Sequence, residues 1–240
     1  MTTFVLVPGF FLGAWSWRSV VEVLRERHHD AYPLSLTGLG ERAHLARPDT
    51  DLEVHVTDVV NLLRYEDLRD VVLVGHSYGG LITTAAADRV PDRIAELVYV
   101  DTGPMPDGFA QADFDPGARE ANEALVAERG DGWRLPPPSW AELAAGVPEV
   151  DEAVVARLDE RAVDQPWLTA TSPVRLTGAW EKLPRRGILS TLTVAQVEQM
   201  PATVPAFKHM AGDAWRFDEL PTWHWPMLSR PRDLAELLLR

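Results

Sequence analysis

The sequence predicts an α/β protein in which helices flank a mostly parallel β-sheet. Three observations predict this class. Short apolar runs alternate with amphipathic helical stretches through most of the chain, a pattern typical of parallel sheets covered on both faces. One of these runs, Val71–Val74, leads directly into a glycine-flanked turn and another helical stretch. The chain has 240 residues, 46% of them hydrophobic, which suits one large domain with a sizeable core.

The first half of the chain divides into short strands and longer helices. Pro8-Gly9 ends the first apolar run, and Ser16 can cap the helix that follows it. The stretch before the glycine-flanked turn carries apolar residues at helical spacing on one side. The expected elements are strands over residues 4–7, 30–36, 71–74 and 94–100, and helices over residues 16–28, 51–65 and 78–90.

The pattern breaks in the middle of the chain. Residues 104–186 hold ten prolines and four tryptophans, among helix-like pieces at residues 118–129 and 149–163. These helices are too few to bury a core of their own, so we expect an inserted helical lid over the carboxyl edge of the sheet. The chain then consists of an α/β core, residues 1–103 and 187–240, and the lid.

The alternation of strands and helices returns after the lid and completes the sheet. Apolar, strand-like runs and helical periodicity reappear in this last quarter of the chain. The expected elements are a strand over residues 187–191, a helical region over 194–210, a strand over 215–220 and a terminal helix over 233–240. The chain contains no internal repeat and no low-complexity tract.

Composition argues against several classes of partner. The formal net charge is −13, which disfavours binding to nucleic acid or to anionic membranes. Without cysteine the chain has no disulfide, thiolate metal site or cysteine nucleophile, which fits a cytoplasmic protein. The N-terminus lacks the features of a signal peptide, and no apolar run reaches transmembrane length. We expect no membrane association, no cofactor, no metal, and a monomer or homodimer.

The glycine-flanked turn is the strongest functional signal in the sequence. Gly75-His76-Ser77-Tyr78-Gly79 is a G-x-S-x-G motif between a β-branched apolar run and a helix. In that strand–turn–helix context the motif predicts a nucleophile elbow, which holds its serine in a strained backbone conformation. The flanking glycines stand where a Cβ would collide with the tight turn. We predict that Ser77 is a nucleophile.

A serine hydroxyl is a weak nucleophile and needs a general base. Seven histidines compete for this role. Most lie on expected helices or in polar loops, and His76 is adjacent to Ser77 but points the opposite way along the strand end. His224 is different because it follows the last expected strand, and loops at the carboxyl ends of parallel strands gather around the ligand site. We predict that His224 acts as base and then as acid.

The acid that orients the histidine is less clear from the sequence. The order serine–acid–histidine allows an acid after either strand between Ser77 and His224. The later strand is followed by no carboxylate, whereas Asp101 stands at the carboxyl end of the strand over residues 94–100. We therefore choose Asp101. Asp218 and Glu219, just before the histidine loop, remain alternatives.

Acyl transfer also needs donors for the developing oxyanion. The residue after the nucleophile, Tyr78, can supply one backbone amide. The second is expected from the loop after the first strand, where Gly9 and Gly13 let the backbone approach a ligand closely. We predict that Phe10 supplies that amide.

Together these residues resemble the α/β-hydrolase superfamily, in particular its small branch of plant methylesterases, hydroxynitrile lyases and short bacterial esterases. The resemblance covers the chain except most of the lid and implies an α/β-hydrolase fold. The segments that carry it are Val5–Gly9 with Gly13–Trp15, Leu36–Gly40, Gly75–Gly80, Leu97–Asp101, and His224 with Met227–Ser229.

The chain departs from this branch at three positions. The branch usually has His-Gly where this chain has Pro8-Gly9. It usually carries its acid after the penultimate strand, whereas some dehalogenase relatives place theirs where Asp101 stands. Its lyases follow the histidine with a lysine that assists the leaving cyanide, and Trp225 occupies that position here. The last departure favours hydrolysis.

Aromatic walls suit flat, uncharged ligands. We expect Phe11, His76, Trp133 and Trp225 to line the substrate pocket. The tryptophan content also resembles that of bacterial esterases that cleave aryl carbamates. The resemblance thus implies a serine hydrolase that cleaves a small aromatic or apolar ester or carbamate through an acyl- or carbamoyl-enzyme. The alternatives are a hydroxynitrile lyase-like lyase and a non-catalytic homologue that binds a small ligand.

Overall fold

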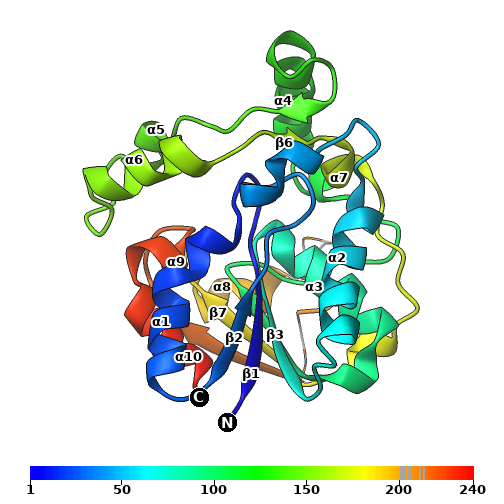
Figure 1. Cartoon of the computed structure of the whole chain (residues 1–240), viewed down its shortest axis with the longest axis vertical. Coiled ribbons are helices and arrows are strands. Elements are labelled where there is room, and N and C mark those ends of the chain that lie inside the picture. The colour runs from blue at the N-terminus through cyan, green and yellow to red at the C-terminus, as the bar shows by residue number, and fades with distance from the viewer. Residues whose placement is uncertain (201–203, 205–206, 211, 213) are drawn as a thin grey trace.

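A parallel sheet forms the centre of the protein, as the sequence predicted (Figure 1). The computed structural model describes residues 1–200, 204, 207–210, 212 and 214–240. Within these residues the sheet has six strands in the order β2-β1-β3-β4-β7-β8, and each neighbouring pair is parallel. The strands are β1 (Thr3–Val7), β2 (Asp30–Pro33), β3 (Val71–His76), β4 (Ile94–Val100), β7 (Arg185–Leu189) and β8 (Trp215–Glu219).

The central strands are buried on both faces, so each supplies side chains to two cores. Successive residues of a strand point to opposite faces. Leu6 of β1 and Val74 of β3 therefore belong to one core, while their neighbours Val5 and Leu73 belong to the other. This explains why the strands read as continuous apolar runs in the sequence rather than as an apolar–polar alternation.

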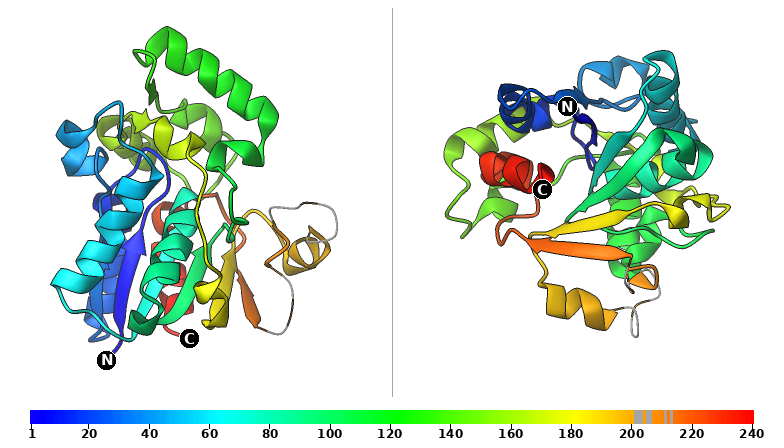
Figure 2. Two further views of the ribbon diagram at one scale, coloured as in Figure 1. Left: turned by 90° about the vertical axis from the view of Figure 1, so that its right-hand side faces the viewer. Right: turned by 90° about the horizontal axis from the view of Figure 1, so that it is seen from below.

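Helices cover both faces of the sheet (Figure 2). On one face α1, α9 and α10 pack with Leu6 and Val74, and on the other α2, α3 and α8 pack with Val5 and Leu73. Their bounds are α1 (Arg18–Glu26), α2 (Leu52–Tyr65), α3 (Tyr78–Arg89), α8 (Val194–Gln199), α9 (Pro226–Ser229) and α10 (Pro231–Leu238). Short 3-10 helices are η1 (Ala14–Trp17), η2 (Gly40–Leu45) and η3 (Pro91–Arg93). In the part of the chain described, no helix is both long enough and apolar enough to cross a bilayer.

Most of the inserted segment, which spans residues 101–184 between β4 and β7, lies above the carboxyl ends of the strands in Figure 1, and its last residues return beside α3 to the start of β7. It holds helices where the sequence predicted them, and its role as a lid stays a prediction. Its elements are η4 (Gln111–Phe114), α4 (Pro116–Arg129), β5 (Arg134–Leu135), α5 (Trp140–Ala144), α6 (Glu152–Arg161), β6 (Gln165–Pro166), α7 (Leu168–Thr171) and η5 (Ala179–Lys182).

The inserted segment has only a small core of its own and shares it with the rest of the chain. Trp140 of α5 and Leu158 of α6 are buried together with Leu12, from the loop after β1, and with Trp223, from the loop after β8. Other residues of the segment, such as Trp180, join the core beneath α3. The segment is therefore packed onto the sheet domain at several points.

The second half of the sheet differs from the expected bounds. Strand β7 begins at Arg185 rather than Gly187, because Arg186 is buried with compensating partners. Its guanidinium lies 3.3 Å from the Glu96 carboxylate and donates to the carbonyl oxygen of Leu237 at 2.6 Å. Helix α8 ends at Gln199, and the rest of the predicted helical region, up to residue 210, lies partly outside the described residues.

Candidate active site

A tight turn joins β3 to α3, and Ser77 stands at its apex. Ser77 has φ +51° and ψ −124°, a conformation that residues other than glycine rarely adopt. A Cβ at Gly75 would lie 2.5 Å from the carbonyl oxygen of Gly79, and a Cβ at Gly79 would lie 2.6 Å from that of Val7. Glycine at these two positions lets the chain turn sharply, so that the Ser77 side chain faces the cavity above the sheet.

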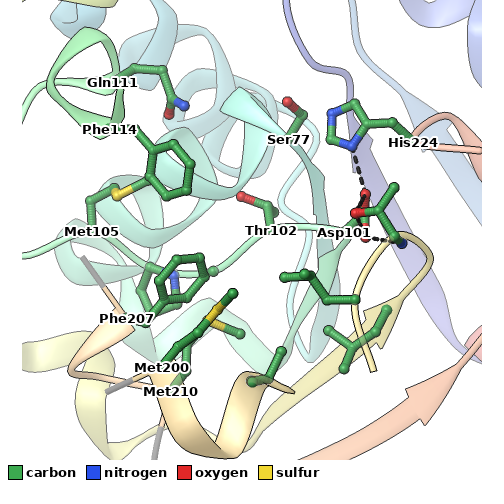
Figure 3. A pocket seen from close by; sticks show the side chains of 16 residues that line it. Ser77, Asp101, Thr102, Met105, Gln111, Phe114, Met200, Phe207, Met210 and His224 are labelled. Atoms are coloured by element: carbon green, nitrogen blue, oxygen red, sulfur yellow. Dashed lines mark hydrogen bonds and ion pairs between the residues drawn. The ribbon is translucent and has the colours of Figure 1, made fainter. Parts of the chain in front are cut away.

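His224 lies on the loop between β8 and α9, and Asp101 directly follows β4. The Nδ1 atom of His224 and the Oδ2 atom of Asp101 are 2.6 Å apart. Because a carboxylate accepts, this Nδ1 carries the proton and the other ring nitrogen is left for a second partner. Figure 3 shows that nitrogen on the side of Ser77. The structure thus brings Ser77, Asp101 and His224 together at one end of a shared cavity.

The Asp101 carboxylate is nearly enclosed and held by several donors. Its Oδ1 accepts from the backbone amides of Ser190 and Thr191, at 2.9 Å each, and its Oδ2 accepts from the Thr191 hydroxyl at 2.9 Å. Burial, the largest single influence, opposes ionisation, but the hydrogen bond and charge of His224 and these amides outweigh it and lower the pKa of Asp101 to about 2. Asp101 is therefore an anion at neutral pH.

The two alternative acids lie elsewhere. The Glu219 carboxylate accepts from the backbone amide of Val194 at 2.7 Å, at the start of α8. The Asp218 carboxylate lies 3.4 Å from the Arg240 guanidinium near the C-terminus. Neither lines the cavity that holds Ser77 and His224. Asp101 reaches it because β4 pairs with β3, so the carboxyl ends of the two strands are adjacent.

The loop after β1 lies directly against the elbow. A Cβ at Gly9 would lie 3.0 Å from the Cβ of Ser77, so the backbone at Gly9-Phe10 passes beside the serine. The Phe10 ring packs on the Tyr78 ring with 4.5 Å between centroids. Among the described residues, no partner accepts from the backbone amides of Phe10 and Tyr78. The oxyanion role expected of these two amides stays a prediction.

A buried histidine fixes the Tyr78 side chain. His55 is fully buried within α2. Its Nε2–H donates to the carbonyl oxygen of Thr37 at 2.8 Å, so its Nδ1 accepts from the Tyr78 hydroxyl at 3.1 Å. Burial lowers the pKa of His55 to about 4, and the ring is neutral in the folded protein. These hydrogen bonds hold the Tyr78 side chain in place next to the Ser77 turn.

Ser77 and His224 open into a largely apolar cavity of about 490 Å³ (Figure 3). Methionine, phenylalanine and leucine side chains from η4, β7 and the segment after α8 form most of its wall. Thr102 and Gln111 add uncharged polar groups to the lining. The lining is Ser77, Asp101, Thr102, Gly103, Pro104, Met105, Gln111, Phe114, Leu189, Thr191, Leu192, Val197, Met200, Phe207, Met210 and His224.

The four aromatic residues expected in the substrate pocket do not line this cavity. Phe11 and Trp225 both pack edge-on against Trp140, at centroid distances of 6.1 and 5.3 Å, because they join the small core beneath α5 and α6. Trp133 lies beneath the guanidinium of Arg134, 5.0 Å from its ring centroid, at the start of β5. His76 is buried on the other side of the Ser77 turn.

Sequence reasoning missed the aliphatic and sulfur-containing part of the wall. Three of the chain's five methionines, Met105, Met200 and Met210, lie in the cavity lining. Unbranched methionine side chains adapt to irregular spaces, so their clustering is a usable sign of a binding surface. Met105 stands near the start of the inserted segment, whereas Met200 and Met210 follow α8, and no local motif links them.

His76 makes a hydrogen bond to the backbone of the loop that carries His224. Its Nε2–H donates to the carbonyl oxygen of His224 at 2.7 Å, and the two rings lie 4.8 Å apart. Burial, followed by the nearby His224 charge, lowers the pKa of His76 to about 3, so this ring is neutral. His76 therefore contacts the backbone that carries the candidate base and does not reach the cavity.

Comparisons with known proteins agree with this architecture. Residues 4–237 match the family described as "Alpha/beta hydrolase family". The chain is 31% identical over 247 aligned positions to the carbendazim hydrolyzing esterase of Nocardioides sp. (strain SG-4G), covering 99% of this chain and 98% of that protein. It is 38% identical over 105 residues to methylesterase 8 of Arabidopsis thaliana, covering 43% of this chain and 38% of the methylesterase.

Solved structures show the same fold. An extracellular α/β-hydrolase from a Paenibacillus species, described as sharing structural and functional homology with tobacco salicylic acid binding protein 2, superposes with a TM-score of 0.83. The identity is 24%, and the match covers 100% of this chain and 98% of the other. At that identity the likeness bears on the fold alone.

Proposed function

The chain belongs to the alpha/beta hydrolase family and is a hydrolase, and from this premise we propose that it is a serine esterase with Ser77, Asp101 and His224 as its triad. One observation carries the proposal. The His224 ring is held by the Asp101 carboxylate at 2.6 Å and shares one end of the cavity with the serine of a nucleophile elbow. A serine, a histidine and a buried acid in that order of contact perform acyl transfer in several unrelated folds.

The proposed reaction has two halves. The Ser77 hydroxyl attacks the substrate carbonyl carbon while the free ring nitrogen of His224 takes its proton. The oxyanion accepts hydrogen bonds from the amides of Phe10 and Tyr78, and the Asp101 anion stabilises the imidazolium. His224 then protonates the leaving alcohol as the acyl- or carbamoyl-enzyme forms. In the second half, water attacks that carbonyl with His224 as base, and Ser77 is released.

The cavity supports a neutral, apolar substrate. Apart from Asp101 and His224, its described lining carries no charged side chain, so a charged substrate would lose hydration without gaining an ionic partner. The carbendazim hydrolyzing esterase, which matches this chain over nearly its whole length, supports a carbamate as well as an ester as the substrate. We therefore propose a small aromatic or apolar carboxylic ester or carbamate as the substrate.

Replacing the nucleophile tests the proposal. Ser77→Ala should remove hydrolysis of p-nitrophenyl esters and aryl carbamates, with a loss on the order of 10⁶-fold in kcat and an unchanged fold. Ser19→Ala, on α1, is the matched control and should retain full activity. The measurement is product release, with circular dichroism to check folding. Undiminished turnover by the Ser77 variant would show that another group attacks the substrate.

The same assay separates the two other functions. A fluorophosphonate should label Ser77 in the native protein, because only an activated serine attacks phosphorus at a useful rate. Labelling together with cyanide release from a cyanohydrin, and no ester turnover, would indicate a lyase. Tight binding of an aryl ester without labelling or turnover would indicate a non-catalytic binding protein.

A further inference from the structure

Two hydrogen bonds from the inserted segment hold the loop after β1, one to the amide and one to the carbonyl oxygen of Phe11. The Phe11 amide donates to the side-chain Oε1 of Gln165 at 3.1 Å, and the Phe11 carbonyl oxygen accepts from the amide of Val163 at 3.0 Å. Phe11 has φ +68°, in the left-handed region that a non-glycine residue occupies only when its surroundings hold it there. These two contacts therefore keep a strained residue in place beside Phe10.

The direction of the Gln165 amide is set by its other neighbours. Gln165 is fully buried, at the start of β6. The Thr169 hydroxyl donates to the carbonyl oxygen of Pro166 at 2.6 Å, so it can only accept from Gln165, whose Nε2 lies 2.8 Å away. That leaves Oε1 facing the Phe11 amide. The network thus presents an acceptor to the loop, and it prevents the Gln165 amide from exchanging the positions of its oxygen and nitrogen.

We propose that Gln165 is a positioning residue for the oxyanion hole. The inference rests on the proposed function, in which the Phe10 amide, one peptide before Phe11, stabilises the oxyanion. If the acceptor at Gln165 is lost, the Phe11 amide is buried without a partner and the strained residue is free to relax. The Phe10 amide then loses its direction, while the cavity wall that binds the substrate is unchanged, because Gln165 does not line the cavity.

The inserted segment would accordingly take part in catalysis without touching the substrate. An oxyanion donor acts on the transition state and contributes little to ground-state binding. Loss of the anchor should therefore lower kcat and leave KM nearly unchanged. A purely structural contact would instead lower stability with kcat preserved, and a contact to substrate would raise KM.

The test uses Gln165→Met in the full-length protein, because methionine has nearly the same shape and lacks the amide. We expect kcat for a p-nitrophenyl ester to fall about 10- to 100-fold, with KM within about 3-fold of the native value. The affinity for a trifluoromethyl ketone, which forms a tetrahedral oxyanion on the serine, should fall by the same factor as kcat/KM.

Two further variants keep the outcome clear. Thr169→Ser retains the hydroxyl that accepts from Nε2 of Gln165 and so keeps Oε1 beside Phe11, and its kcat should stay within about 3-fold even where the melting temperature falls. Gln165→Glu, buried and therefore protonated, retains an acceptor for Phe11 and a donor for Thr169, and should restore much of the lost kcat.

The results separate this inference from the proposed function. If the native protein hydrolyses the ester and the Gln165→Met variant keeps its kcat, or changes only in KM, the role of Gln165 alone is overturned. The role of Gln165 is also overturned if kcat of the Gln165→Glu variant is no higher than that of Gln165→Met. A native protein that neither hydrolyses esters nor is labelled at Ser77 by a fluorophosphonate would overturn the proposed function itself.

Discussion

Asp101 shows how one residue is prepared for an electrostatic task. It has φ +49°, and this unusual backbone conformation turns its carboxylate back toward the amides that follow β7. An anion that already accepts from two backbone amides and a hydroxyl cannot rotate freely toward solvent. The remaining strong interaction is with Nδ1 of His224, which fixes the tautomer of that ring.

Replacing this carboxylate should therefore have a far larger effect than replacing either alternative. We expect Asp101→Asn to lower kcat roughly 10³- to 10⁴-fold, because the amide favours the wrong tautomer of His224. Glu219→Gln, which keeps an acceptor for the amide of Val194, should stay within about 3-fold of native kcat. Ester turnover by the two purified variants checks this. A larger loss in the Glu219 variant would instead assign the role of the acid to Glu219, in β8.

The sequence allowed these residues to be chosen because each follows a strand that the sequence predicts. Ser77, Asp101 and His224 follow three different strands, and parallel strands place such ends on one edge. The pocket wall could not be found this way. Tryptophans such as Trp225 are large enough to serve either a pocket or a core, and burial against Trp140 and Trp223 decided for the core.

Among the elements, the elbow depends most on the absence of side chains. The first turn of α3 passes the end of β1 so closely that a Cβ at Gly79 would lie 2.6 Å from the carbonyl oxygen of Val7 and 2.8 Å from that of Pro8. Backbone atoms of a central strand cannot give way without breaking its pairing with β3. The geometry of the Ser77 turn is thus set by the packing of two strands and one helix.

A single added methyl group should expose this dependence. In Gly79→Ala the new Cβ would lie 2.6 Å from the Val7 carbonyl oxygen, and we expect a loss of about 3 kcal/mol or more in unfolding free energy. Gly117→Ala is the matched control, because its Cβ meets nothing nearer than 3.4 Å in α4. That variant should be neutral or stabilised by up to about 1 kcal/mol. Urea unfolding measures both, and equal stability of the two variants would contradict the argument.

The sequence predicted the bounds of an element correctly where its apolar residues are buried and its charged residues are not. The strand predicted over residues 94–100 is β4, and the helix predicted over residues 51–65 is α2, with Asp51 as its cap. The start of β7 was missed because Arg185 and Arg186 read as solvent-exposed, whereas Arg186 is buried. Its partners, Glu96 and the end of α10, are distant in sequence and carry no local signal.

At the scale of the whole molecule, the folded state keeps two histidines buried and uncharged. Burial lowers the pKa of His55 to about 4 and that of His76 to about 3. The unfolded chain binds these protons near pH 6.5, so it gains protons first as the pH falls. The stability that neutral His55 and His76 contribute is complete above about pH 6.5 and is lost as the pH falls toward about 4.

This linkage gives a measurable pH dependence. For His55 the change amounts to about 3 kcal/mol of unfolding free energy between about pH 6.5 and about pH 4. His55→Gln should therefore show a flatter dependence of stability on pH than the native protein. His44→Gln, at an exposed position in η2, should leave the slope unchanged. Urea titrations across this range provide the measurement, and equal slopes in all three proteins would contradict it.

The sequence predicted the fold class correctly but not how the middle of the chain attaches to it. Its prolines and tryptophans marked residues 104–186 as different, and the helices near residues 118–129 and 149–163 are present. The contacts of Gln165 with Phe11 and of Trp140 with Trp223 join residues far apart in the sequence. Such contacts depend on three-dimensional packing and leave no periodic pattern.

The order of the strands also has a consequence for protein synthesis. The turn that bears Ser77 leaves the ribosome early, whereas the loop with His224 follows the last strand of the sheet. Under the proposed mechanism, a nascent polypeptide that stops before residue 224 carries the alcohol without the imidazole that would activate it. Reactivity toward esters would then require synthesis through the His224 loop, and shorter fragments would be chemically silent.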